Sequence, residues 1–243
     1  MRYYYDLHLH SCLSPCADDD MTPANIAGMA LIQGIGIAAL TDHNTSANCP
    51  AFFSHAVRHG IVPVAGMELT TSEEVHVVCL FSTLESAMQF DRIVSARRVR
   101  VKNRPEIFGR QLIMNDEDEI ISEEEDLLLN ATEFDLESAY REVASLGGVC
   151  YPAHIDRESG GIISVLGTFP EYPVYEAFEL NEAASLDFYL ESYPVLQGKR
   201  HVVSSDAHNL WNIREACASV ELDDEPYSSQ KIRDSLIAYL RGE

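Results

Sequence analysis

Residues 35–69 read IGIAALTDHNTSANCPAFFSHAVRHGIVPVAGMEL. The runs at 35–41 and 61–69 are apolar and short, which is typical of buried strands. The segment at 50–59 between them is typical of a helix, and Gly60 ends it. A strand, a helix and a second strand in this order form one unit of an α/β fold.

The same alternation continues on both sides of this stretch. Further strands are expected at 3–8, 75–81, 149–153, 174–180 and 201–205. Helices are expected from Thr22-Pro23 to Gly34, from Leu84 onward, and at 134–146 with Asp135 as a cap, 182–191 and 228–240. Repeated units of this kind predict a parallel sheet or barrel. The 243 residues are an ordinary length for one such domain, which we take as 1–243.

A charged stretch at about 97–130 interrupts the pattern. Residues 97–104 are basic and residues 116–126 are almost wholly acidic. We interpret the stretch as an insertion or lid. A solvated face or mobile loop is the common behaviour of such charge runs, and a gate over the substrate is the alternative.

Charge and composition limit the choice of partners. Asp and Glu number 39 against 17 Lys and Arg, a net charge of −22, which repels polyanions and makes long nucleic acid a poor partner. The six cysteines form no CxxC pair and are expected to be thiols. No apolar run approaches the roughly 18 residues that span a bilayer, and no signal-peptide pattern is present. We therefore expect a cytoplasmic protein without a membrane partner; the oligomeric state is not readable from the sequence.

The histidines are concentrated at the ends of the predicted strands, where the active sites of α/β proteins form. His8 and His10 flank Leu9, and a two-residue step along an extended chain points both imidazoles to one side. The other candidates at strand ends are His43, Glu68, His76, His154, Asp206 and His208. Buried ionisable groups are costly unless they are paired or bind a metal, and imidazole mixed with carboxylate suits Zn, Fe or Mn. The pattern therefore predicts a metal centre.

These residues resemble, in order and context, the motifs of the PHP (polymerase and histidinol phosphatase) family: His8-Leu9-His10, Thr41-Asp42-His43, Glu68, His76, Pro152-Ala153-His154 and Ser205-Asp206-Ala207-His208. The resemblance covers nearly the whole chain. It implies the distorted, TIM-like (β/α)7 barrel of that family, and a phosphoesterase with two or three divalent transition metals. It also implies three ligand sets: His8, His10, Glu68 and Asp206; Glu68, His76 and His154; and, for part of a third, His43 and His208.

One ligand of the third metal differs from the pattern of the family. Histidinol phosphatases have a histidine eight residues after the first histidine of the HxH motif, and here that position is Cys16. Cys16 is the favoured ligand as a thiolate, and Asp18 or Asp19 would reach the same metal if the loop runs differently. The alternative is a buried Cys16 beside a site for two metals only.

The implied reaction is hydrolysis of a phosphate ester by a hydroxide that bridges the metals. The candidates for catalysis are Asp206, His208 and Arg157. The leaving oxygen would take its proton from His208, from His43 or from water. Asp42 is expected to orient His43 or another ligand.

Arg157 follows His154 by three residues and is the candidate phosphate clamp. A surface salt bridge from Arg157 to Asp156 or Glu158 is the alternative.

The substrate that fits the acidic composition is a small phosphorylated metabolite or a nucleotide. An exonuclease acting on short oligonucleotides is the nearest alternative, and a basic groove beside the metals would favour it. A non-catalytic metal-binding domain is an alternative of another class, and it would bind metal without turnover.

Overall fold

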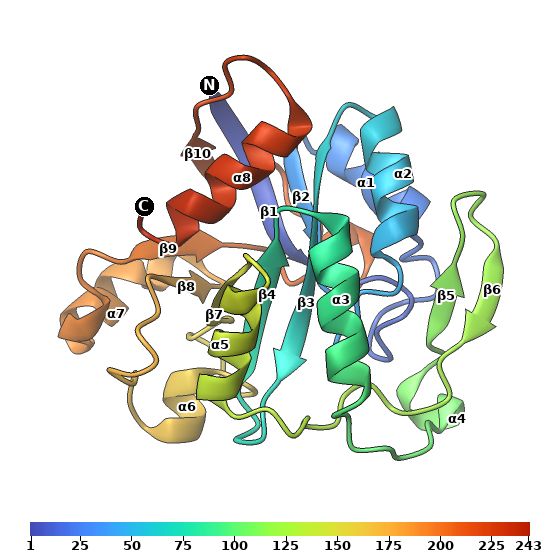
Figure 1. The fold of residues 1–243 in the computed structure, drawn as a ribbon, viewed down its shortest axis with the longest axis horizontal. Coiled ribbons are helices and arrows are strands. Elements are labelled where there is room, and N and C mark those ends of the chain that lie inside the picture. Colours follow the sequence, from blue (N-terminus) through green and yellow to red (C-terminus); the bar gives the residue numbers. More distant parts are fainter.

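The computed structural model describes residues 1–243 as a distorted barrel wrapped by helices (Figure 1). Six strands form one sheet in the order β10-β1-β2-β3-β4-β7, and β8 and β9 form a separate parallel pair. The strands are β1 (Arg2–Leu9), β2 (Ile37–Leu40), β3 (Val62–Thr70), β4 (His76–Phe81), β7 (Val149–Pro152), β8 (Ala177–Leu180), β9 (Arg200–Val203) and β10 (Ser219–Glu221).

The pair β8–β9 completes the circle between β7 and β1. β8 lies beside β7, and the chain that continues β9 meets the end of β1, where the amide of His10 donates to the carbonyl of Ala207 at 3.1 Å. Seven strands, with β10 added outside β1, therefore surround one interior. The predicted distorted (β/α)7 barrel is confirmed.

The helices cover the outside of the barrel and close one end of it. They are α1 (Pro23–Ile32), α2 (Cys49–Arg58), α3 (Leu84–Ser95), α5 (Leu136–Ser145), α6 (Ile162–Leu166), α7 (Leu186–Ser192), α8 (Ser229–Leu240) and three 3-10 turns, η1 (Ala183–Ser185), η2 (Pro194–Leu196) and η3 (Leu210–Asn212). The side chains of Thr22 and Asp135 cap α1 and α5 as predicted. Buried residues of α8, among them Leu236 and Leu240, pack with the apolar residues that the strands turn inward. The opposite end of the barrel holds the polar side chains.

One strand runs against the predicted direction. β4 is antiparallel to both β3 and β7, so the expectation of an all-parallel sheet is wrong for this strand. The reason is the connection: only residues 71–75 separate β3 from β4, and a crossover to a parallel strand needs a dozen residues or more. The reversal brings His76, the first residue of β4, opposite Thr70 at the end of β3.

The charged stretch forms a small excursion at one side of the barrel, with the short helix α4 (Pro105–Phe108) and the hairpin of β5 (Leu112–Met114) and β6 (Ile120–Glu123). Its basic and acidic runs face each other: Arg98 pairs with Glu124 at 2.8 Å, and Arg100 with Asp126 at 2.7 Å. The amide of Leu112 donates to the carbonyl of Cys12 at 2.9 Å, which fixes the hairpin to the loop after β1.

None of the helices is both long enough and apolar enough to cross a bilayer.

Candidate metal centre

The predicted ligands gather at the barrel end opposite α8. His8 lies in β1 and Glu68 in β3, whereas the other members stand at or just beyond strand ends. His8, His10, Glu68, His154, His43 and Asp206 are all buried. Only the side chains of His76 and His208, 20% and 24% exposed, open the cluster to solvent.

Glu68 lies at the middle of the cluster. Its Oε1 is 2.8 Å from Nδ1 of His76 and 3.0 Å from Nε2 of His154. Its Oε2 is 2.9 Å from Nδ1 of His43 and 3.2 Å from Nε2 of His10. Burial by itself raises the pKa of Glu68, but the histidines around it, His76 and His8 foremost, outweigh burial and hold that pKa well below its ordinary value.

Asp206 is the second carboxylate of the cluster and contacts His8 and His10. Its Oδ1 is 3.0 Å from Nε2 of His10 and 3.5 Å from Nε2 of His8. The ring of His208 stacks on that of His10 with centroids 4.1 Å apart, and the ring of His43 lies 4.5 Å from His10 on a tilted plane. His10 therefore contacts the carboxylates of Glu68 and Asp206 and the rings of His43 and His208.

Three overlapping groups have ligand atoms close enough together to hold a cation. They are His8, His10, Glu68 and Asp206; His43, Glu68 and His76; and His10, His43 and His208. Oε2 of Glu68, Oδ1 of Asp206 and Nδ1 of His43 are buried, and although they lie within 2.9–3.0 Å of other atoms of the cluster, none of these contacts has the geometry of a hydrogen bond. Buried polar atoms are rarely left unpaired, and converging carboxylate oxygens and imidazole nitrogens are the ligands of divalent transition metals. The donor set fits such ions.

Asp42 orients His10 rather than binding in the cluster. Its carboxylate accepts from the Ser11 amide at 2.6 Å, the Ser11 hydroxyl at 2.6 Å and the Ser14 hydroxyl at 2.7 Å. Oγ of Ser14 in turn lies 2.9 Å from Nδ1 of His10, and the His43 amide donates to it at 3.2 Å. Asp42 thus acts on two ligands through one serine.

Glu179 of β8 is a member of the site that the sequence analysis missed. It is buried, and its Oε1 lies 2.8 Å from Nδ1 of His8 and accepts from the His154 amide at 3.2 Å. This contact fixes which nitrogen of His8 faces the cluster. The available signal was an acid near the end of the predicted strand at 174–180, a position similar to that for which Glu68 was chosen.

Four candidate ligands lie outside the three groups: Cys16, Asp18, Asp19 and His154, although Nε2 of His154 is 3.0 Å from Oε1 of Glu68. The side chain of Cys16 is exposed and belongs to none of them. Asp18 and Asp19 are exposed too, although the amide of Asp18 donates to the carbonyl of His208 at 2.9 Å and so keeps their loop beside the cluster. Asp19 lies 3.8 Å from Arg110 of the charged excursion.

Arg157 reaches the cluster. Its Nη1 donates to Oδ2 of Asp206 at 2.6 Å, so the expected alternative, a bridge to Asp156 or Glu158, is not formed. Asp156 instead accepts from the amide of Asn181 at 2.8 Å.

Two candidate ligands adopt backbone conformations that are costly for residues with a side chain. His154 has a φ of 25° and Asp206 a φ of 50°. Strain of this kind, of order 1–3 kcal/mol, persists where the surroundings impose it, and it is common at functional sites. His154 lies two residues after the end of β7 and Asp206 three residues after the end of β9, where the backbone turns each side chain into the cluster.

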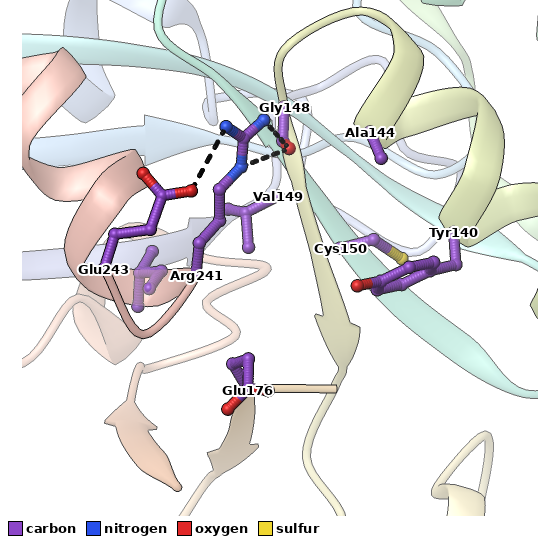
Figure 2. A pocket seen from close by; sticks show the side chains of 9 residues that line it. Tyr140, Ala144, Gly148, Val149, Cys150, Glu176, Arg241 and Glu243 are labelled. Atoms are coloured by element: carbon purple, nitrogen blue, oxygen red, sulfur yellow. Dashed lines mark hydrogen bonds and ion pairs between the residues drawn. The ribbon is translucent and has the colours of Figure 1, made fainter. Parts of the chain in front are cut away.

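A separate cavity of about 240 Å³ lies at the other end of the barrel (Figure 2). It lies between Tyr140 of α5, the start of β7 and the C-terminal residues, where Arg241 donates to the carbonyl of Gly148. None of its lining residues belongs to the metal groups.

Known proteins resemble the chain in sequence and in fold. A 5′-3′ exoribonuclease from Haemophilus influenzae is 35% identical over 83 residues, which are 33% of this chain and 29% of that protein. The match thus spans less than a third of the length of that relative. The lesion-specific endonuclease Q from Pyrococcus furiosus has a similar fold, with a TM-score of 0.65 and 17% identity over 100% of this chain and 56% of that one.

A protein from Bifidobacterium adolescentis that is described as a metal-dependent phosphoesterase gives a TM-score of 0.59, with 15% identity over 96% of this chain and 95% of that one. At such identities the two structures show the shared fold. The model of the PHP domain matches residues 6–158, which include His8, His10, Glu68 and His154. Since this match covers more than half of the 243 residues, the chain belongs to the PHP domain family.

Proposed function

We propose that this chain is a metal-dependent phosphoesterase that hydrolyses a small phosphorylated metabolite or a nucleotide. The observation that carries the proposal is Glu68, a buried carboxylate with imidazole nitrogens of four different strand ends within 3.2 Å of its two oxygens. A carboxylate in this position is suited to bridging two cations.

The contacts support three ligand sets. His8, His10, Glu68 and Asp206 form the set for one metal. Glu68 with His76 and His154 forms the second, because both imidazoles approach the same oxygen. His43 and His208, which share a group with His10, form part of a third. Zn, Fe and Mn all suit this mixture of ligands.

Divalent cations in these sites would lower the pKa of water and neutralise the charge of the phosphoryl group. The chain itself does the remaining work. Arg157, 42% exposed and held against Asp206, can turn one guanidinium edge to a phosphate oxygen. Nδ1 of His208 donates to the carbonyl of Asp206 at 2.8 Å, and burial lowers the pKa of His208 to about 3, so Nε2 of the neutral ring has no proton to give and is free to bind the third cation. The leaving oxygen would then take its proton from water.

The narrow opening supports a small substrate. Among the groups named above, only His76, His208 and Arg157 are more than a few per cent exposed. Arg157 is the one basic side chain that contacts the cluster, and a polyanion gains little there against a net charge of −22. The likeness to an exoribonuclease favours a second candidate, removal of nucleotides from the end of short RNA.

The test combines metal content with turnover. The purified protein is analysed for Zn, Fe and Mn per chain, and phosphate release is measured over phosphomonoesters, nucleotides and short oligonucleotides. The variants His10→Ala and Asp206→Ala are compared with His59→Ala and Asp187→Ala, which remove the same residue types from exposed positions.

We expect two or three metals per chain, and phosphate release that is lost in the first two variants and kept in the controls. Stoichiometric metal without turnover on any compound would favour a non-catalytic metal-binding domain. Faster release from oligonucleotides than from monomers would favour the exonuclease. A protein that retains no metal, even after reconstitution, would refute the proposal.

A further inference from the structure

A cavity of about 380 Å³ opens beside His76. Three segments enclose it: the turn from β3 to β4, the end of the charged excursion, and the loop after His154. Its lining residues are Thr70, Glu74, His76, Leu129, Asn130, Ala131, Glu158, Ser159, Gly160 and Val165. Because His76 belongs to both the cavity and the metal cluster, a molecule in the cavity would lie against the site of reaction.

The walls of the cavity are fixed to residues of the cluster. Asn44, which follows His43, donates from Nδ2 to the carbonyls of Leu128 at 2.7 Å and Asn130 at 2.9 Å, and its Oδ1 accepts from the Thr70 amide at 2.8 Å. These three bonds hold the end of the excursion beside β3. A cavity whose wall is tied in this way is largely formed before a ligand arrives.

The facing wall is tied to His76 itself. The amide of His76 donates to the carbonyl of Gly160 at 2.8 Å. Gly160 has a φ of +69°, and a Cβ at this position would lie 2.7 Å from the His76 ring. The loop at Gly160 thus packs directly on the imidazole of His76. That imidazole lines the cavity itself.

The chemistry of the lining is polar and acidic. Glu74 and Glu158 are exposed at the rim of the cavity and form no ion pair, and neither Lys nor Arg lines the cavity. Nδ2 of Asn130 is a buried donor without a hydrogen-bond partner. That nitrogen lies beneath the surface of the cavity, so the lining offers a ligand two negative charges, which suit hydroxyl or amino groups and repel a further anion.

We propose that this cavity binds the alcohol part of the phosphate ester, and that it selects an uncharged or cationic, hydrogen-bonding alcohol against one with a second phosphate. The inference rests on the proposed phosphoesterase function and adds the class of its leaving group. In this arrangement the phosphoryl group would lie at the cluster, next to Arg157, and the alcohol would extend past His76 toward Glu74 and Glu158.

The experiment uses two matched pairs of compounds: ribose 5-phosphate with ribose 1,5-bisphosphate, and adenosine 5′-phosphate with adenosine 3′,5′-bisphosphate. For each pair the metal-loaded protein is tested in two ways, by kcat/KM for phosphate release and by calorimetric titration of the non-hydrolysable phosphonate analogues. The variants are the Glu74→Gln/Glu158→Gln double variant and, as a matched control, Glu171→Gln, an exposed glutamate outside the cavity.

We expect the wild-type protein to favour the monophosphate of each pair by about threefold or more at low salt, since two exposed carboxylates about 10 Å from a second phosphate act on it through water and are screened by salt. The double variant should bring the ratio of the two compounds of a pair close to one, and the control should keep the preference.

Equal or tighter binding of the bisphosphates by the wild-type protein, or a preference that the double variant leaves intact, would overturn the inference. Its failure can be told from that of the proposed function. If no ester is hydrolysed but the phosphonates bind with the expected preference, the hydrolysis fails and the selectivity of the cavity stands.

Discussion

Glu179→Gln tests whether the missed residue of the site controls the metal affinity. The substitution keeps the shape of a side chain that is 1% exposed and removes its charge. In the wild-type protein the Nδ1–H of His8 donates to Oε1 of Glu179 at 2.8 Å, and this bond points Nε2 of His8 toward Glu68 and Asp206. In Glu179→Gln the amide oxygen can still accept a hydrogen bond from Nδ1 of His8, but the acceptor is then uncharged.

The magnitude follows from that one bond. A hydrogen bond to a charged group contributes about 1.5–3 kcal/mol and a neutral one about 1 kcal/mol. The difference of roughly 0.5 to 2 kcal/mol corresponds to a metal affinity about two- to thirtyfold weaker in Glu179→Gln. Glu179→Ala also leaves the His154 amide and the imidazole of His8 without their acceptor, so it should weaken the affinity by about 100-fold, at the upper end of such effects.

The assay is calorimetric titration of the metal-stripped protein with Mn²⁺ and Zn²⁺, with far-UV circular dichroism to check the fold. Glu176→Gln is the matched control, because Glu176 is exposed and precedes the same strand at the other end of the barrel. Wild-type affinity in both Glu179 variants would refute the reasoning, since the contact to His8 would then carry no weight.

Three further outcomes follow from single contacts. Gly160→Ala should lower activity severalfold and stability by about 1–2 kcal/mol, because the left-handed backbone disfavours alanine and the methyl group meets His76; a Tm or an activity equal to that of the wild-type protein would contradict this. Asp42→Asn should cost about 1–3 kcal/mol in urea unfolding of the metal-stripped protein, since the buried Ser14 hydroxyl loses its charged acceptor, and a change below 0.5 kcal/mol, roughly the size of a surface effect, would count against it. Trp211→Ala should leave the unfolding free energy within about 0.5 kcal/mol, because that side chain is 88% exposed, and a larger loss would reveal packing absent from the structure.

Much of the fold and of the site was readable from the sequence. The resemblance to the PHP family is confirmed by the match over residues 6–158, and with it, at the level of the family, the predicted enzyme class of metal-dependent hydrolase. The strand ends were readable because each is marked locally, by an apolar run that stops at a polar residue such as His43 or His154. The helix caps at Thr22 and Asp135 depend only on the next three residues, so they too were predictable.

What the sequence alone determined is therefore the set of candidate ligands and the strand ends that carry them. Only the tertiary structure decided the direction of β4, the contact of Glu179 with His8, the reach of Arg157 to Asp206 and the position of Cys16 outside the cluster. The physical reason is distance along the chain. Glu179 is 171 residues from His8 and Arg157 is 49 from Asp206, and partners so far apart meet only because the barrel closes.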